Sequence, residues 1–271
     1  MAGVLALVVL AGCSGDSDDS ESGSTTTAPE AEELDILVTN DDGFAAEGID
    51  AVVEALRELP NVEITVTAPA GNRSGSGSQT TPGALTATEE TTKSGYPVAA
   101  VDGFPADSVN YALANGADPD VVVAGINEGQ NLGPFSTISG TVGAAKAAAT
   151  EGIPALAASQ GIGEGIEFET AAQYVVEWVT AHRDALVERT ALKEVVSLNV
   201  PTCSAGSVRG LRQEPLAATN ADAIGTPSDC ESTATEFDDD IAAFIAGFAT
   251  VTQLTATGET VTSSTTWPAS G

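Results

Sequence analysis

Short runs of apolar residues alternate with amphipathic stretches through most of this chain, and this alternation constrains the fold more than any other feature. Runs such as 36–39, 120–124 and 195–200 have the length and composition of buried strands. The stretch 47–59 instead carries its apolar residues at helical spacing on one face. Strands that alternate with helices are typical of an α/β protein with a mainly parallel sheet, and we predict that fold class.

The pattern also gives approximate bounds for each element. The predicted strands are 36–39, 62–68, 98–101, 120–124, 154–158 and 195–200. The predicted helices are 47–59, 105–115, 141–151 and 169–187. Residues 240–254 are predicted to form either a helix or a pair of strands.

Composition excludes several classes of protein. The chain has 271 residues, and its 42% apolar content is too high for a disordered chain. It carries 39 acids against 9 bases, so we expect no binding to a nucleic-acid duplex through a basic face. Three cysteines and one histidine are too few soft ligands for a Cys/His zinc site. No apolar run approaches the ~20 residues that span a bilayer.

The first 33 residues differ from the rest of the chain. Residues 1–12 form an apolar run that we predict to be a signal peptide, the alternative being a buried N-terminal strand. The run ends in Leu10-Ala11-Gly12-Cys13, which resembles the lipobox of bacterial lipoproteins, in which the cysteine carries the lipid. We therefore predict an exported protein whose only membrane attachment is a lipidated Cys13 on the extracytoplasmic side.

The remaining domain boundaries follow from composition. Residues 13–33 contain seven acids and no large apolar residue, which predicts a flexible tether. Residues 34–254 are predicted to be one folded domain, and 255–271 a Thr/Ser-rich tail.

Polar and glycine-rich clusters follow four of the apolar runs, where open α/β sheets place their ligands. Asp41 and Asp42 follow the first strand, and two adjacent carboxylates repel each other unless a cation lies between them, although the sequence also suits a simple turn. Residues 71–78 form a Gly/Ser loop that suits an anion or a plain linker. Residues 125–133 alternate glycine with polar residues, which predicts a loop round a ligand rather than a strand or helix. Residues 139–141 open a helix, where a phosphate site or an ordinary N-cap is expected.

The segments ILVTNDDG, APAGNRSGS, GFPADSV, VVVAGINEGQNLG and ISGTVGAAKAA together resemble the SurE family of stationary-phase survival nucleotidases. The resemblance is specific because five motifs agree in order. It implies a Rossmann-like three-layer α/β/α sandwich that binds one divalent metal. It also implies a metal-dependent phosphomonoesterase, a 5′/3′-nucleotidase that converts nucleoside monophosphates to nucleoside and phosphate.

The resemblance also implies roles for individual residues. The metal ligands of the family correspond to Asp41, Asp42, Ser74 and Asn127, which are all oxygen donors and suit Mg²⁺ or Mn²⁺. Asp41 and Asp42 are the expected catalytic residues. The phosphate-contacting positions correspond to Asn131, Ser139, Gly140 and Thr141, with the N–H groups of Ser139 and Thr141 expected to hold phosphoryl oxygens.

Two departures from the family leave alternatives open. Phe104 and Ser108 replace a threonine and a cysteine of the family motif, and the region after Pro201 is shorter and less basic. That region usually supplies oligomer contacts, so the oligomeric state stays open, with a homodimer among the alternatives. The competing functional class is a lipoprotein that binds nucleotide or phosphate without hydrolysis.

Two features near the C-terminus complete the predictions. Cys203 and Cys230 are predicted to form a disulfide in an exported protein, the alternative being two free thiols. The acidic run Asp238-Asp239-Asp240 is predicted to be a solvated face rather than a calcium site.

Overall fold

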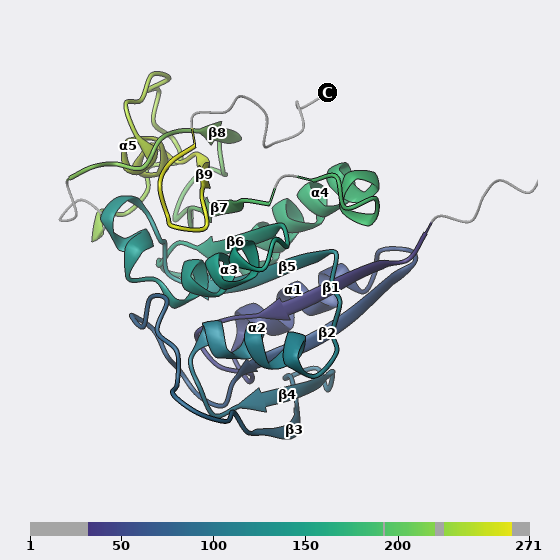
Figure 1. Ribbon diagram of the computed structural model, residues 1–271. Coiled ribbons are helices and arrows are strands. Elements are labelled where there is room, and N and C mark those ends of the chain that lie inside the picture. The colour runs from purple at the N-terminus through teal and green to yellow at the C-terminus, as the bar shows by residue number, and fades with distance from the viewer. Residues whose placement is uncertain (1–31, 192, 220–224, 262–271) are drawn as a thin grey trace, which may run out of the picture. The chain divides into compact units, whose positions relative to one another are not determined.

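One sheet of nine strands organises the part of the chain that the structure describes, in the order β3-β4-β2-β1-β5-β6-β7-β9-β8 (Figure 1). The computed structural model describes residues 32–191, 193–219 and 225–261. Neighbouring strands from β4 to β7 pair in parallel, β3 and β9 are antiparallel to β4 and β7, and β8 is parallel to β9. The predicted α/β class with a mainly parallel sheet is confirmed.

The observed bounds agree with the predicted ones in the centre of most elements. The strands are β1 (Leu34–Thr39), β2 (Val62–Pro69), β3 (Ala87–Thr91), β4 (Pro97–Val101), β5 (Val121–Glu128), β6 (Ala155–Gln160), β7 (Val195–Val200), β8 (Leu211–Gln213) and β9 (Ala249–Leu254). The helices are α1 (Glu47–Leu56), α2 (Pro105–Ala114), the short 3-10 helix η1 (Gly133–Thr137), α3 (Gly140–Thr150), α4 (Phe168–Val187) and α5 (Asp240–Ile245).

Helices cover both faces of the sheet and make the three layers. Figure 1 shows α2 and α3 on the near face and α1 and α4 behind the strands. The apolar side of α1 and of α4 packs on Ile36, Val38 and their neighbours, whereas α3 places its alanines against Leu37 and Val122. The small side chains of α3 let that helix lie close to the sheet. This arrangement is the Rossmann-like α/β/α sandwich that the motifs implied.

The order of the strands creates a crevice beside β1. After β1, the chain forms β2, β3 and β4 on one side of β1 and then crosses over, so that β5 pairs with the other side of β1. At such a switch point the connections leave the carboxyl ends of two neighbouring strands in opposite directions, which opens a space for a ligand. The residues after β1 and at the end of β5 therefore lie close together, on the side of the sheet where the parallel strands have their carboxyl ends.

Three elements differ from the sequence-based expectation. β3 was not predicted because its sequence, ATEET, lacks apolar alternation; it is an exposed edge strand, where charged residues are favourable. The prediction that residues 125–133 are neither strand nor helix is confirmed for 129–132 and wrong at both ends, because β5 continues to Glu128 and η1 begins at Gly133. The continuation contains an irregularity in register between Ala124 and Asn127, which hid the strand from a search for period-two alternation.

A disulfide closes a loop within the region after β7, and a buried carboxylate connects this region to η1. Cys203 and Cys230 are joined, with their Cα atoms 5.7 Å apart. The prediction of a solvated acidic run is wrong for Asp240, whereas Asp238 is exposed and Asp239 is half-buried. The side chain of Asp239 caps α5 by accepting the N–H of Ala242 at 2.9 Å, and Asp240 is buried.

The ordered chain continues past Leu254. The N–H of Thr255 donates to the carbonyl of Glu259 at 2.9 Å, and the N–H of Val261 donates to that of Gln253 at 2.8 Å. The predicted signal peptide, the lipidated Cys13, the tether up to residue 31 and the tail from residue 262 lie outside the described residues. Within the described part, no helix combines the length and apolar character needed to cross a membrane.

Candidate metal and phosphate site

The turn after β1 sets the directions of the two predicted carboxylates. The Nδ2 of Asn40 donates to the carbonyl of Gly43 at 2.9 Å, and the N–H of Gly43 donates to Oδ1 of Asn40 at 3.2 Å. Gly43 has a φ of +100°, and a Cβ there would lie 3.0 Å from the carbonyl carbon of Gly71. The turn therefore requires glycine. It leaves Asp41 buried in the crevice and Asp42 half-buried beside it.

Asp41 lies beneath the first turn of α3. Its side chain is 2% exposed, and Oδ1 accepts a hydrogen bond from the hydroxyl of Thr141 at 2.6 Å. Burial raises the pKa of the Asp41 carboxyl to about 6; hydrogen bonds from Thr141 oppose this shift, and the charge of Asp42 adds to it. Ionised Asp41 is thus disfavoured by its surroundings, and a bound cation would offset that cost.

Asp42 connects the loop after β2 with the end of β5. Its Oδ1 accepts hydrogen bonds from Nδ2 of Asn72 at 3.1 Å and from the hydroxyl of Ser74 at 3.5 Å. Its Oδ2 accepts the N–H of Glu128 at 3.0 Å. Burial raises the pKa of Asp42, and these hydrogen bonds lower it in part. Asp42 therefore connects the turn after β1, the loop after β2 and the end of β5 through hydrogen bonds. Asn127 directly precedes Glu128, which is the partner of Asp42 on β5.

The two asparagines after Ala124 have fixed side-chain amides. The Nδ2 of Asn127 donates to the carbonyl of Gly129 at 2.6 Å, which orients its oxygen away from that carbonyl. Asn131 is held by the next two strands, since its N–H donates to Oδ1 of Asn199 at 2.6 Å and its Nδ2 donates to the hydroxyl of Ser159 at 2.9 Å. Both side chains are thereby held in place where β5, β6 and β7 end.

The N-terminus of α3 is capped as the sequence predicted. The hydroxyl of Ser139 accepts the N–H of Val142 at 3.1 Å. The N–H of Ser139 itself donates to the carbonyl of Phe135 at 3.1 Å, and both the backbone and the hydroxyl of Thr141 face Asp41. The N–H of Ser139 and the backbone of Thr141 thus have partners within the chain, and the expectation that these groups hold phosphoryl oxygens stays a prediction. Gly140 lies between them and faces the crevice.

Gly140 and Ser76 form a small cradle against Asp41. A Cβ at Gly140 would lie 2.8 Å from Oδ2 of Asp41 and 2.9 Å from the hydroxyl oxygen of Ser76, so only glycine fits. The Ser76 hydroxyl is buried and finds no hydrogen-bond partner among the residues that the structure describes. A buried polar atom without a partner is costly, and a ligand at this point would satisfy it. Sequence reasoning missed Ser76 because the repeat Gly-Ser-Gly-Ser offers no local signal that distinguishes one serine from the next.

The donor set suits a hard divalent cation. The structure brings together oxygen atoms of Asp41, Asp42 and Ser74, with Asn127 next to the backbone that binds Asp42. A second acidic group among the described residues is formed by Glu33, Asp35 and Glu63. This group lies at the amino ends of β1 and β2, whereas the candidate site lies at the carboxyl ends, so the group is no part of this site.

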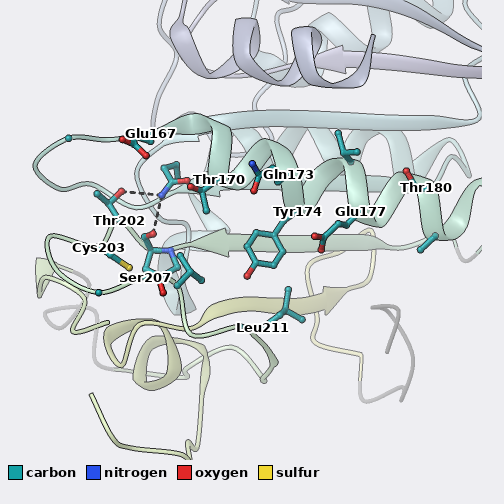
Figure 2. Close-up of a pocket in the computed structure, with 18 residues that line it drawn as sticks. Glu167, Thr170, Gln173, Tyr174, Glu177, Thr180, Thr202, Cys203, Ser207 and Leu211 are labelled. Atoms are coloured by element: carbon teal, nitrogen blue, oxygen red, sulfur yellow. Dashed lines mark hydrogen bonds between the residues drawn. The ribbon is translucent and has the colours of Figure 1, made fainter. Parts of the chain in front are cut away.

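A groove on the described surface lies away from this site. It measures about 1250 Å³ and runs between α4 and the segment after β7, as Figure 2 shows. Glu167 and Glu177 line it, and its 18 lining residues include no lysine or arginine. A groove with only negative charges disfavours a phosphate ligand, and the chemistry is better matched by the smaller crevice at Asp41.

Fold and site together define a doubly wound α/β protein with an oxygen-rich, acidic site at its switch point. The family described as "Survival protein SurE" matches residues 36–224, and the chain belongs to the SurE family. It is 39% identical over 187 residues to the 5′-nucleotidase SurE of Methylococcus capsulatus, which covers 68% of this chain and 71% of that protein. It is 40% identical over 182 residues to the 5′-nucleotidase SurE of Aeromonas hydrophila, with coverages of 65% and 69%.

The fold is also similar to a solved member of the family. The crystal structure of the SurE protein from Aquifex aeolicus superimposes with a TM-score of 0.64 and 28% sequence identity. The superposition covers 82% of this chain and 93% of that one. The resemblance drawn from five short motifs is confirmed at the level of the family.

Proposed function

We propose that this chain is a metal-dependent 5′/3′-nucleotidase that hydrolyses nucleoside monophosphates to nucleoside and phosphate. The observation that carries the proposal is the pair Asp41 and Asp42, held at the switch point beside the N-terminus of α3. Relatives that are 35–43% identical and named 5′-nucleotidase SurE support the same reaction.

The metal ligands in this proposal are Asp41, Asp42, Ser74 and Asn127. A set of four oxygen donors favours Mg²⁺ or Mn²⁺ over zinc. When bound, such a cation supplies positive charge for the phosphoryl oxygens and makes a bound water more acidic. The raised pKa of both carboxyls and the unpartnered Ser76 hydroxyl fit a position built to receive a ligand.

Each remaining group has a role that its position supports. With a cation bound, the carboxylate of Asp41 would be ionised, and we assign it the role of holding the attacking water or accepting its proton. Thr141 orients that carboxylate through its hydroxyl. Gly140 and Ser139, at the positive end of α3, are placed to contact the phosphoryl oxygens, with Asn131 beside them.

A phosphate-release assay tests this function. Purified protein is incubated with a panel of 5′- and 3′-nucleoside monophosphates in Mg²⁺, Mn²⁺ or EDTA. We expect release of phosphate in at least one metal and none in EDTA. Activity that survives exhaustive chelation would contradict the metal dependence, and binding of nucleotide without release would favour the non-catalytic lipoprotein.

Substitution of Asp42 tests the site itself. Asp42→Asn removes one of two repelling carboxylates, so we expect the apo protein to keep its melting temperature or gain slightly. The phosphatase rate should fall at least about 100-fold, as expected when a key electrostatic group is lost. Metal should raise the melting temperature of the wild type more than that of the variant. Asp184→Asn, an exposed carboxylate of α4, is the matched control. A well-folded and fully active Asp42→Asn protein would contradict the assignment.

We also propose that the protein is exported and attached to a membrane by a lipid on Cys13. The apolar run 1–12 and the tetrad that ends at Cys13 support this location. The disulfide between Cys203 and Cys230 agrees with it, because disulfides persist mainly in oxidising compartments.

A further inference from the structure

Three large apolar side chains are exposed among the residues that the structure describes. They are Phe135, Ile138 and Ile162, with exposed fractions of 38%, 52% and 56%. Single exposed apolar residues are normal on any protein. These three, which we call the apolar rim, come from two segments that are hydrogen-bonded to the loops of the candidate site: Phe135 and Ile138 from η1 and the residue after it, and Ile162 from the loop after β6.

Ile162 lies next to the predicted ligand Asn127. Its N–H donates to the side-chain oxygen of Gln130 at 3.0 Å, which anchors the loop after β6 to the loop after β5. A Cβ built on Gly129 would lie 3.6 Å from Cγ2 of Ile162 and 3.8 Å from Nδ2 of Asn127. The side chains of Ile162 and Asn127 therefore flank the same glycine.

Phe135 and Ile138 lie in the segment that directly precedes the N-terminus of α3. The carbonyl of Phe135 accepts the N–H groups of both Ile138 and Ser139, each at 3.1 Å. The carbonyl of Ile138 accepts the N–H of Gly77 at 2.9 Å, in the loop that carries Ser74 and Ser76. The backbone that supports these two side chains is thus bonded to both sides of the candidate phosphate site.

We infer that the apolar rim binds the base of the nucleotide and so selects nucleotides over other phosphomonoesters. This inference rests on the proposed function. A nucleobase presents flat, uncharged faces that pack well on an aromatic ring and on branched aliphatic side chains. Such faces are not repelled by the acidic groups of the site, as Asp42 and Glu128 would repel an anionic leaving group. The phosphate-contacting side of the crevice is polar, so apolar side chains beside it serve the rest of the substrate.

The test compares two substrates that differ only by the base. Adenosine 5′-monophosphate and ribose 5-phosphate share the same phosphorylated sugar, so the ratio of their kcat/KM values reports base recognition. Phe135→Ala and Ile162→Ala, which remove exposed atoms and should leave folding intact, are compared with Tyr111→Ala, a half-buried aromatic residue of α2 outside the rim. We expect each rim variant to lower kcat/KM for the nucleotide about tenfold, mainly through KM, and to change the value for ribose 5-phosphate less than twofold.

Direct binding of adenosine, measured by calorimetry, gives a readout that needs no catalysis. We expect Kd to rise about tenfold in each rim variant and to stay constant in Tyr111→Ala. If wild-type protein releases no phosphate from either substrate, the proposed function fails, and adenosine binding still decides the role of the rim. Equal losses on both substrates, or an unchanged Kd, would overturn the inference. A change of sedimentation coefficient without a change of Kd would instead assign the rim to contact between copies of the chain.

Discussion

Asp41 occupies a buried position where its ionised form is unfavourable unless positive charge is near. The carboxylate receives hydrogen bonds from Thr141, but they only partly offset the loss of water. A Cβ on Gly140 would collide with it, so the residue above it must be glycine. The same features that raise the energy of the empty site raise its affinity for a cation.

The pH dependence of stability follows from this residue. The pKa of Asp41 is 3.8 in a model chain and about 6 when folded, so the folded state holds the proton more tightly. The stabilisation is complete below pH 4 and is lost as the pH rises through 6, a change of about 3 kcal/mol. We expect the melting temperature of metal-free wild type to fall between pH 4 and 7 relative to that of Asp41→Asn. Thermal unfolding in EDTA measures this, and parallel profiles for the two proteins would contradict it.

At the scale of elements, the segment after β7 depends on a few long-range contacts. Asp240, at the start of α5, accepts the N–H of Gly133 and the N–H of Ala217, both at 2.8 Å. This carboxylate connects α5 to η1, which precedes the phosphate-site helix. The disulfide closes the 27-residue separation between Cys203 and Cys230. Both contacts add to two small apolar clusters of this segment, one around Ile241 and Phe244 and one around Ala243 and Phe248.

Removal of the disulfide should destabilise this segment. For a loop of this length the loss is about 3–4 kcal/mol, so we expect Cys203→Ser with Cys230→Ser to unfold at lower denaturant concentration. In a Cys13→Ser background only these two cysteines remain. Thiol titration of that protein, unfolded without reductant, should find no free thiol. Two free thiols in protein from its native, oxidising compartment would contradict the bridge.

At the scale of the whole molecule, the formal net charge of −30 opposes both folding and the binding of an anionic substrate. Salt shortens the range of this repulsion, to about 3 Å at 1 M. We therefore expect added NaCl to raise the melting temperature and to lower KM for nucleoside monophosphates. A neutral osmolyte at equal osmolality is the control. Stability and KM that do not respond to salt would contradict a dominant role for the net charge.

In the proposal of export, attachment to a membrane depends on Cys13 alone. A diacylated Cys13 would provide two acyl chains, enough for stable anchoring. We expect the wild type to sediment with membranes and Cys13→Ser to appear in the soluble exported fraction. Wild-type protein found wholly in the cytosol would contradict export.

The sequence by itself determined the fold class and proposed where the candidate site lies. Strands such as β7 and helices such as α4 were predictable because local periodicity records which face of an element is buried. Asp41 and Asp42 were predictable as a site because chemistry in an open α/β sheet follows the carboxyl ends of strands. Five ordered motifs then identified the family without any structural information.

Only the tertiary structure decided which polar atoms are free to act. The N–H groups of Ser139 and Thr141 are engaged by Phe135 and Asp41, partners that local sequence cannot reveal. Ser76 is buried under Gly140, and Asp240 is buried beside η1, because segments distant in sequence cover them. The burial of a polar atom and its hydrogen-bond partner depend on contacts between such segments. Secondary-structure propensity and hydrophobic periodicity depend on neighbours along the chain, and so only the elements and the family motifs could be predicted from the sequence.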